Sequence, residues 1–522
     1  MLASAKPGQD GRDVRVADLL DAAATDLDAR FRDQPDLEVA ARLSLRAAYD
    51  SLGMAEQSLH NLRRAHQASR LAYTEDGRET LRLAGDLARV LAFSLNPGEA
   101  EPLARATYER SRRVLGSSDH VTLSAGTALA DSLGFLGRYD ESESLERELI
   151  RDTPTPPDEY AHHRLWCLAG RVGFLGDNAE AIRLLYQALD TARATGKADP
   201  AFRLTVIPLL GRSLAAEARY DEAEREYAAV VSDPVMLAGQ FTVGAVPRLG
   251  DTVEKAFSGI VRDYAALLES RGNGAGAARV RSEHLARLRA ALPPPGATSA
   301  STLIRRANLL ARLGRFNEAA ADFGRAIELR PEDHVHWYLL GCLLAYAGEP
   351  DAYRAHCQAM LVRFGTSTDR FVADRTAKSC LVLPDATADL ARQLRLVGVV
   401  LAPGGDDGMM PWNQLLKGMA EYRQGNFAAA IEPLEQTRQC PYPGLHATRA
   451  TATMFLAMAH HRLKRAEESR GLLEEARKVM DQELPKAGVE DLEFTVIEDW
   501  LICHAVRREA EALIAGDQAP VR

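Results

Sequence analysis

A short cassette of residues recurs along the chain and constrains its fold more than any other feature. Each copy joins an apolar helical segment, which ends in Gly or a small residue, to a polar turn and an Ala near the start of a second helical segment. The clearest copies are LGRYDES, LGDNAEA, ARYDEAE and LGRFNEA, at residues 136–142, 175–181, 218–224 and 313–319. One such helix pair cannot bury its apolar face alone, so neighbouring pairs must stack. The sequence therefore predicts an all-α array of helix pairs.

The turns of this cassette are predicted at intervals of about 40 residues. The predicted turn positions are Gly53, Leu95, Gly137, Gly176, Ala218, Gly272, Gly314, Gly348, Gly425 and Lys464. The longest interval, 77 residues between Gly348 and Gly425, is close to two ordinary intervals and predicts a degenerate pair around residues 369–400. We therefore expect an α-solenoid, a right-handed superhelix of about eleven antiparallel helix pairs.

The copy at residues 303–331 resembles the tetratricopeptide repeat (TPR), a unit of 34 residues. It carries the spaced residues of that unit: Leu303, Ala307, Leu310, Gly314, Ala319, Phe323, Ala326 and Pro331. The small Ala307 and Ala319 let the two helices of a pair approach closely, while larger residues fill the space toward the next pair. The Gly at the turn supplies the left-handed conformation that ends the first helix.

Copies with a spacing of 42 residues are similar to the kinesin-light-chain type of TPR. The similarity rests on Thr80-Leu81 before Leu87-Ala88, and on Thr122-Leu123 before Leu129-Ala130. Eight residues beyond 34 add about one turn to each helix of a pair. The sequence departs from that type where its members carry paired Asn, because Gly85-Asp86 and Thr127-Ala128 occupy those positions.

Residues 332–480 and the segment that starts VRVADLLDAAATDLDAR at residue 14 resemble the C-terminal TPR region of a group of bacterial serine/threonine protein kinases. In that group a kinase domain precedes the repeats, whereas these 522 residues contain no counterpart of it. The resemblance implies kinase-linked signalling without kinase activity in this chain. Two alternatives stay open: a stand-alone relative, or the regulatory and substrate-docking half of a kinase whose catalytic domain lies upstream or in another polypeptide.

Pro- and Gly-rich segments predict where the array is interrupted, because neither residue continues a helix well. The triple Pro at 293–295 predicts the main boundary. We expect a disordered N-terminus at 1–13, a first array at 14–292 with a capping helix at 14–30, a linker at 293–301, a second array at 302–514 with a terminal helix at about 489–514, and a tail at 515–522.

Composition excludes several classes of protein. The 64 Lys and Arg against 73 Asp and Glu give a net charge of −9, which argues against a general nucleic-acid binder. No apolar run approaches the ~18 residues of a membrane span, and the N-terminus lacks the apolar core of a signal peptide. The six Cys are scattered, which favours free thiols and a cytoplasmic protein. Adjacent His pairs at 162–163 and 460–461 do not share a helix face, so no metal site is predicted.

Motifs that could indicate catalysis fit packing or turns better. The D-F-G triplet at 322–324 lies inside a predicted second helix, with Phe323 at a packing position. The GNGAG segment at 272–276 has the composition of a phosphate loop but follows a helical segment, and Cys357 is predicted to be a buried thiol. We therefore expect a non-enzymatic chain without a cofactor.

Surface geometry supplies the remaining prediction. In a TPR array the first helix of each pair lines the concave side, which is the default binding surface for a protein or peptide. By register, the predicted partner-binding residues are Arg89, Asp131, Trp166, Arg212, Asn308, Arg312, Tyr338 and Tyr422. Mixed charge with aromatic side chains suits a protein segment as the ligand. We expect the chain to be a monomer.

Overall fold

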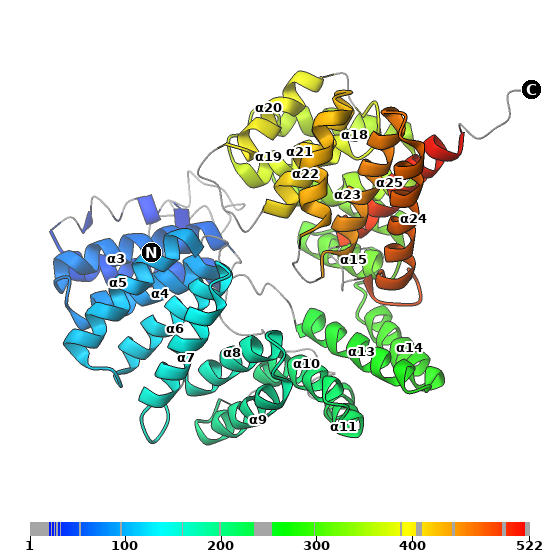
Figure 1. The fold of residues 1–522 in the computed structure, drawn as a ribbon. Coiled ribbons are helices and arrows are strands. Elements are labelled where there is room, and N and C mark those ends of the chain that lie inside the picture. The colour runs from blue at the N-terminus through cyan, green and yellow to red at the C-terminus, as the bar shows by residue number, and fades with distance from the viewer. Residues whose placement is uncertain are drawn as a thin grey trace, which may run out of the picture. The chain divides into compact units, whose positions relative to one another are not determined.

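A computed structural model shows stacked helix pairs (Figure 1). It describes residues 20–21, 23–25, 27, 30–31, 33–51, 54–93, 97–158, 160–197, 200–233, 253–296, 298–386, 389–402, 410–440, 444–492 and 497–516. Within these ranges there is no β-strand, and eleven successive helix pairs are followed by one further helix, α25. The predicted all-α TPR-type solenoid and its number of pairs are therefore confirmed. The chain divides into two compact units, residues 1–267 and residues 268–522.

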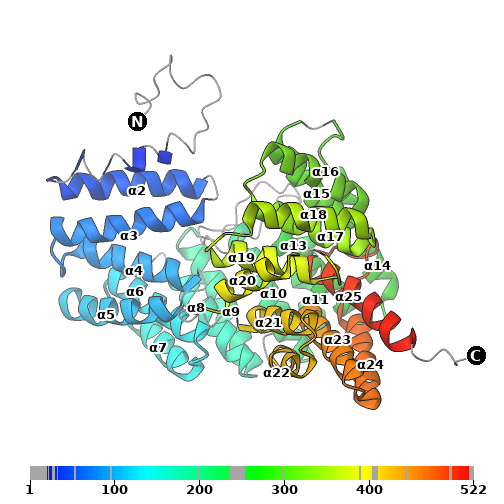
Figure 2. The same ribbon diagram turned by 90° about the horizontal axis from the view of Figure 1, so that it is seen from above.

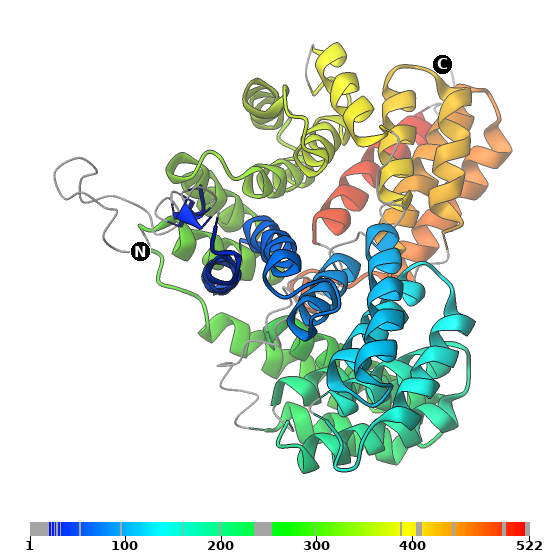
Figure 3. The ribbon, with the colours of Figure 1, turned by 90° about the vertical axis from the view of Figure 1, so that its left-hand side faces the viewer.

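The first unit stacks its helix pairs in chain order, as the change from blue to teal in Figure 3 shows. Its pairs are α2 (Pro35–Ser51) with α3 (Ala55–Ala72), α4 (Arg78–Phe93) with α5 (Pro97–Leu115), α6 (His120–Phe135) with α7 (Tyr139–Asp152), α8 (Ala161–Phe174) with α9 (Asn178–Ala194), and α10 (Pro200–Ala216) with α11 (Tyr220–Val231). Helix α13 (Val253–Ser270) contributes residues to both units, and α14 (Gly274–Ala290) belongs to the second.

The second unit continues the same pattern. Its further pairs are α15 (Ala300–Arg312) with α16 (Phe316–Leu329), α17 (His334–Ala347) with α18 (Pro350–Phe364), α19 (Arg370–Leu381) with α20 (Leu390–Val400), α21 (Met410–Arg423) with α22 (Phe427–Arg438), and α23 (His446–Arg462) with α24 (Ala466–Glu483). Helix α25 spans Ile497–Gly516. The pair α19–α20 is the degenerate pair expected near 369–400.

The turns within pairs have the predicted left-handed backbone. Positive φ angles occur at Gly137, Gly176, Ala218, Gly272, Gly314, Gly348, Gly425 and Lys464. In the degenerate pair the same conformation falls on Asp385, with a φ of 55°. Gly53 and Leu95 lie outside the described residues, as do most of the N-terminal segments expected at 1–13 and 14–30, and all of the tail after Gly516.

Small residues of the first helices permit the close packing of each pair. A Cβ on Gly126 of α6 would lie 2.5 Å from Leu149 Cδ2 of α7. A Cβ on Gly211 of α10 would lie 2.2 Å from Cζ of Tyr227 of α11, whose side chain is fully buried. These separations are far below ordinary contact, so the first and second helices approach more closely than any larger residue would permit.

The packing interpretations of the motif-like segments are confirmed. Phe323 of the D-F-G triplet is fully buried inside α16, and Cys357 is fully buried inside α18. The GNGAG segment forms the end of the turn before α14 and the first residues of that helix, and the Asn273 side chain accepts a hydrogen bond from the Gly276 amide. All six cysteines have free thiols.

Helix α25 follows the last pair of the second unit and packs on its first helix, α23, and it also lies alongside α17 (Figure 2). The terminal helix predicted from the sequence is present as α25, and besides the last pair it contacts the earlier helix α17. Side chains of the first helices hold α25 in this position through hydrogen bonds and an ion pair. The Asp499 carboxylate accepts hydrogen bonds from Thr448 at 2.7 Å and Trp412 at 3.3 Å, and Glu509 forms a two-point ion pair with Arg423 at 2.5 and 2.7 Å.

Candidate functional site

The first helices of several successive pairs contact one another and form a surface, here named the first-helix face. In the first unit α4 contacts α6, and α8 contacts α10; in the second unit α17, α19, α21 and α23 contact in turn. Four predicted partner-binding residues belong to this face in each unit. We expect a binding site on this face, because second helices cover its other side.

In the first unit the predicted residues differ in exposure. The Arg212 side chain is 61% exposed and the Arg89 side chain 28%. The Arg89 guanidinium lies 5.9 Å from the centre of the Tyr160 ring. Trp166 is half-buried, and its Nε1 donates to the Thr205 carbonyl at 3.3 Å. Asp131 is buried, at 7% exposure. Arg89, Trp166 and Asp131 lie close together.

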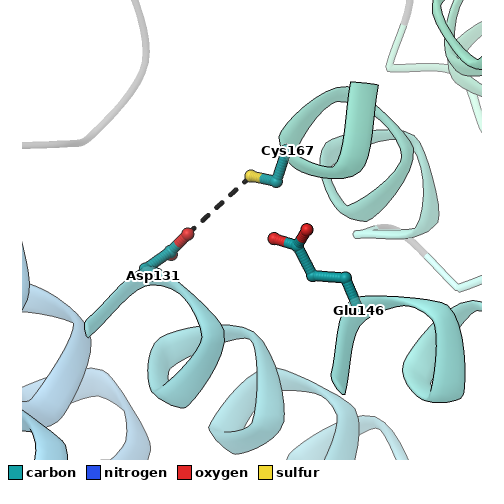
Figure 4. Close-up of side chains that lie close together, drawn as sticks. All are labelled: Asp131, Glu146 and Cys167. Carbon is teal, nitrogen blue, oxygen red and sulfur yellow. Dashed lines mark hydrogen bonds between the residues drawn. The ribbon is translucent and has the colours of Figure 1, made fainter. Parts of the chain in front are cut away.

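Three side chains whose oxygen or sulfur atoms could bind a metal ion lie close together beside Arg89. They come from three consecutive helices. Asp131 of α6, Glu146 of α7 and Cys167 of α8 each place one oxygen or sulfur atom within 4.8 Å of the other two (Figure 4). We call these three residues the acid–thiol cluster. The Cys167 thiol donates to Asp131 Oδ1 at 3.8 Å, whereas Asp131 Oδ2 is buried without a hydrogen-bond partner. Figure 4 shows the Glu146 carboxylate turned toward the other two side chains.

Burial and mutual repulsion control the charge of this cluster. Burial, reinforced by the negative Glu146, raises the pKa of Asp131 to about 7, while Arg171 and Arg89 partly oppose that rise. Burial also raises the pKa of Glu146, against the opposing ion pair with Arg171, whose Nε donates to Glu146 Oε2 at 3.0 Å. The pKa of the Cys167 thiol lies well above its usual value, mainly through burial and the adjacent Asp131. If all three side chains of the cluster were ionised, their negative charge would therefore exceed the positive charge of the nearby Arg171 and Arg89.

An aromatic layer borders the cluster on α8. The His163 ring nitrogens lie 3.6 and 3.8 Å from Cys167 Sγ, and the Trp166 ring stacks on His163 with centroids 5.4 Å apart. Burial, together with the nearby Arg89, lowers the pKa of His163 to about 3. The imidazole is therefore neutral at physiological pH, a form that keeps one ring nitrogen free to accept a hydrogen bond or bind a metal.

In the second unit the first-helix face is occupied by the C-terminal segment of the same chain. Arg312 forms a two-point ion pair with Asp491 at 2.7 and 3.0 Å. Tyr338 is buried, and its pKa is raised through burial, Cys342 and the acidic Asp499 and Glu498. Tyr422 is buried beside Arg423, the partner of Glu509. Arg312 thus binds Asp491, which precedes α25, while Tyr338 and Tyr422 are buried close to acidic residues of α25.

The fourth predicted residue of this unit, Asn308, is exposed. Beside α25 the second unit keeps a cavity of about 620 Å³, to which Tyr422, Arg423 and Glu509 contribute. Whether any of the eight predicted residues contacts a partner protein stays a prediction.

Sequence reasoning missed the acid–thiol cluster, although it selected Asp131. Cys167 was interpreted as one of several scattered thiols, and Glu146 lies on a second helix, outside the register used for the first-helix face. A signal was present: Asp131 and Cys167 are 36 residues apart, close to one repeat, so both occupy related positions on successive first helices. The direction of Glu146 could not be read from that spacing.

Comparison with known proteins supports the repeat assignment. The family model of the tetratricopeptide repeat matches residues 300–333, the same copy that resembles this repeat by its residue pattern. No curated protein matches the sequence. No helix in the described ranges combines the length and apolarity needed to cross a membrane.

Solved structures with some similarity include a tetratricopeptide repeat protein. A tetratricopeptide repeat protein from Parabacteroides merdae is 14% identical, with a TM-score of 0.29, over 57% of this chain and 98% of that chain. The Cut9-Hcn1 structure of the APC/C hetero-tetramer is 12% identical, with a TM-score of 0.29, over 84% of this chain and 86% of that chain. The fold assignment rests on the helix pairs and the matched repeat rather than on these similarities.

Proposed function

We propose that this chain is a non-catalytic interaction scaffold that binds a segment of a partner protein on the first-helix face of its first unit. The contrast between the two units carries the proposal. In the second unit α25 packs on α23 of the preceding pair and also on α17, which is far from it in sequence, whereas the principal helix contacts in the described part of the first unit join near neighbours in the chain. The first-helix face of the first unit thus corresponds to the surface on which the second unit binds its own C-terminal helix.

The composition of that face favours a protein ligand. Arg89, Tyr160 and Trp166 are half-buried, and Arg212 extends into solvent with 61% of its side chain exposed. Arg, Trp and Tyr are the residues most often responsible for binding energy at protein interfaces. The second unit gives a precedent within the same chain: its first-helix face binds a helix through Arg–carboxylate pairs and aromatic contacts. A partner segment with acidic and apolar side chains would fit the first unit in the same manner.

A variant series on a captured partner tests this proposal. The full chain is used as bait, the captured protein is identified and purified, and its affinity is measured by calorimetry. Arg212→Ala on α10 and Trp166→Ala on α8 are each expected to weaken binding about tenfold or more, equivalent to about 1.4 kcal/mol. Arg225→Ala, an exposed Arg on the second helix α11, is the matched control and should bind like the wild type. Equal effects of Arg212→Ala and Arg225→Ala would contradict the proposed surface.

The pathway is a further part of the proposal and rests on the sequence resemblance to kinase-associated TPR regions. We propose serine/threonine-kinase-linked signalling as the setting. The alternative is that the chain acts as the regulatory and substrate-docking half of a kinase. Capture of a serine/threonine kinase that remains active toward a third, co-captured protein would favour the alternative. Capture of a kinase substrate or regulator without any kinase would favour the scaffold.

A further inference from the structure

We propose that the acid–thiol cluster of Asp131, Glu146 and Cys167 is a binding site for a divalent transition-metal ion of the zinc class. This inference concerns a different ligand from the partner segment and does not depend on the proposed function. The three residues supply two carboxylates and one thiolate, a donor set that suits Zn²⁺ and also its spectroscopic substitute Co²⁺.

The separations among the donor atoms are close to those of a tetrahedral site. Two ligands bound to one zinc ion at ~2.0 and ~2.3 Å lie about 3.5 Å apart. Cys167 Sγ lies 3.8 Å from Asp131 Oδ1, and each residue has a donor atom within 4.8 Å of the other two. Small side-chain rotations therefore suffice to close the three atoms around an ion. Because the donors stand on three packed helices, the backbone does not have to rearrange.

An unsatisfied oxygen is the independent sign that a ligand belongs here. Asp131 is only 7% exposed, yet its Oδ2 has no hydrogen-bond partner. Leaving a buried carboxylate oxygen without a partner costs free energy, and a bound cation would recover that cost. Cys167 is only half-buried, so an ion can reach the cluster past the thiol.

The charges around the cluster can be balanced by a bound divalent cation. Arg171 neutralises Glu146 by a two-point ion pair, in which the carboxylate still has lone pairs for a second cation. With the thiol ionised on binding, the three anionic donors would be balanced by the divalent ion together with Arg171. His163 borders the cluster, with Nε2 3.6 Å from Cys167 Sγ, and the fourth position on the ion is open to water.

Titration of the full, tag-free chain with Co²⁺ tests the proposal. We expect saturation at one ion per chain and a near-ultraviolet absorption band from charge transfer between thiolate and cobalt. Cys167→Ser should abolish this band, and Asp131→Asn should weaken binding at least tenfold. Cys503→Ser, which removes a fully buried thiol in the second unit, is the matched control and should leave both band and affinity unchanged.

A second readout guards against variants that fold poorly. Zn²⁺ should raise the melting temperature of the wild type, because an ion that binds the folded chain stabilises it by mass action. The rise should persist in Cys503→Ser and vanish in Glu146→Gln, with circular dichroism used to confirm that each variant is helical. Absence of the band in folded wild-type protein, or its survival in Cys167→Ser, would overturn the proposal.

Discussion

Glycines inside helices of this array affect stability in opposite ways. Their positions in the helices alone do not show which effect applies. Gly418 lies inside α21, where an added Cβ would be 2.4 Å from Leu434 Cγ of the paired helix α22. Gly324 lies inside α16, where an added Cβ would meet no atom within 4 Å. The first Gly is required by packing, whereas the second only lowers the stability of its helix.

Alanine substitution at these two positions is expected to change stability in opposite directions. Gly418→Ala should lower the free energy of unfolding by about 1–3 kcal/mol, because Leu434 is fully buried and cannot move aside freely. Gly324→Ala should raise it by up to about 1 kcal/mol through better helix propensity. Urea denaturation followed by circular dichroism measures both changes. Destabilisation by Gly324→Ala as large as that by Gly418→Ala would contradict this account.

At the scale of elements, α25 shows what local sequence patterns cannot specify. Its helical character follows from its own residues and was predicted from them. Its place follows from partners far along the chain: Glu509 binds Arg423, and Arg508 donates to the Ala345 carbonyl near the end of α17 at 3.1 Å. Periodicity identifies an apolar side but not the surface that the side will cover. The surface that α25 covers could therefore be learned only from the structure.

Docking of α25 is expected to weaken in acid through His504. Burial, with Arg507 and Arg508 nearby, lowers the pKa of His504 to about 4, from an ordinary value of 6.5. The unfolded chain therefore binds more protons between these two pH values, so the stabilisation is complete above pH ~6.5 and is lost as pH falls toward ~4. Allowing for partial solvation, we expect the loss to reach about 1–2 kcal/mol.

Denaturation of wild type and His504→Gln at several pH values measures this effect. The Gln side chain keeps a comparable polar group but does not titrate. Its stability should therefore depend less on pH between 7 and 4.5 than that of the wild type, with the difference growing steadily toward acid. Parallel curves for the two proteins would show that His504 does not control the acid response.

At the scale of the whole molecule, the repeat made the architecture predictable and left the surfaces partly unpredictable. Turn positions such as Gly176 and Gly425 follow from local residues, so helix pairs and their number could be read from the sequence. Register also placed Arg89, Asp131 and Trp166 near one another. It could not reveal that Glu146 turns toward Asp131, which depends on the packing of two paired helices, or that residues such as Tyr338 are buried near acidic residues of the distant α25.

Removal of residues 484–522 tests whether the array responds only locally. In a repeat array each pair contacts its neighbours, so a lost element should affect the helices it touched and little else. Hydrogen exchange followed by mass spectrometry should show faster exchange in α17, α21 and α23, which pack on or bind α25. Exchange in α4, α6 and α8 should be unchanged, as should Co²⁺ binding by the acid–thiol cluster. Faster exchange throughout the chain would show instead that both units unfold together and that α25 stabilises the molecule as a whole.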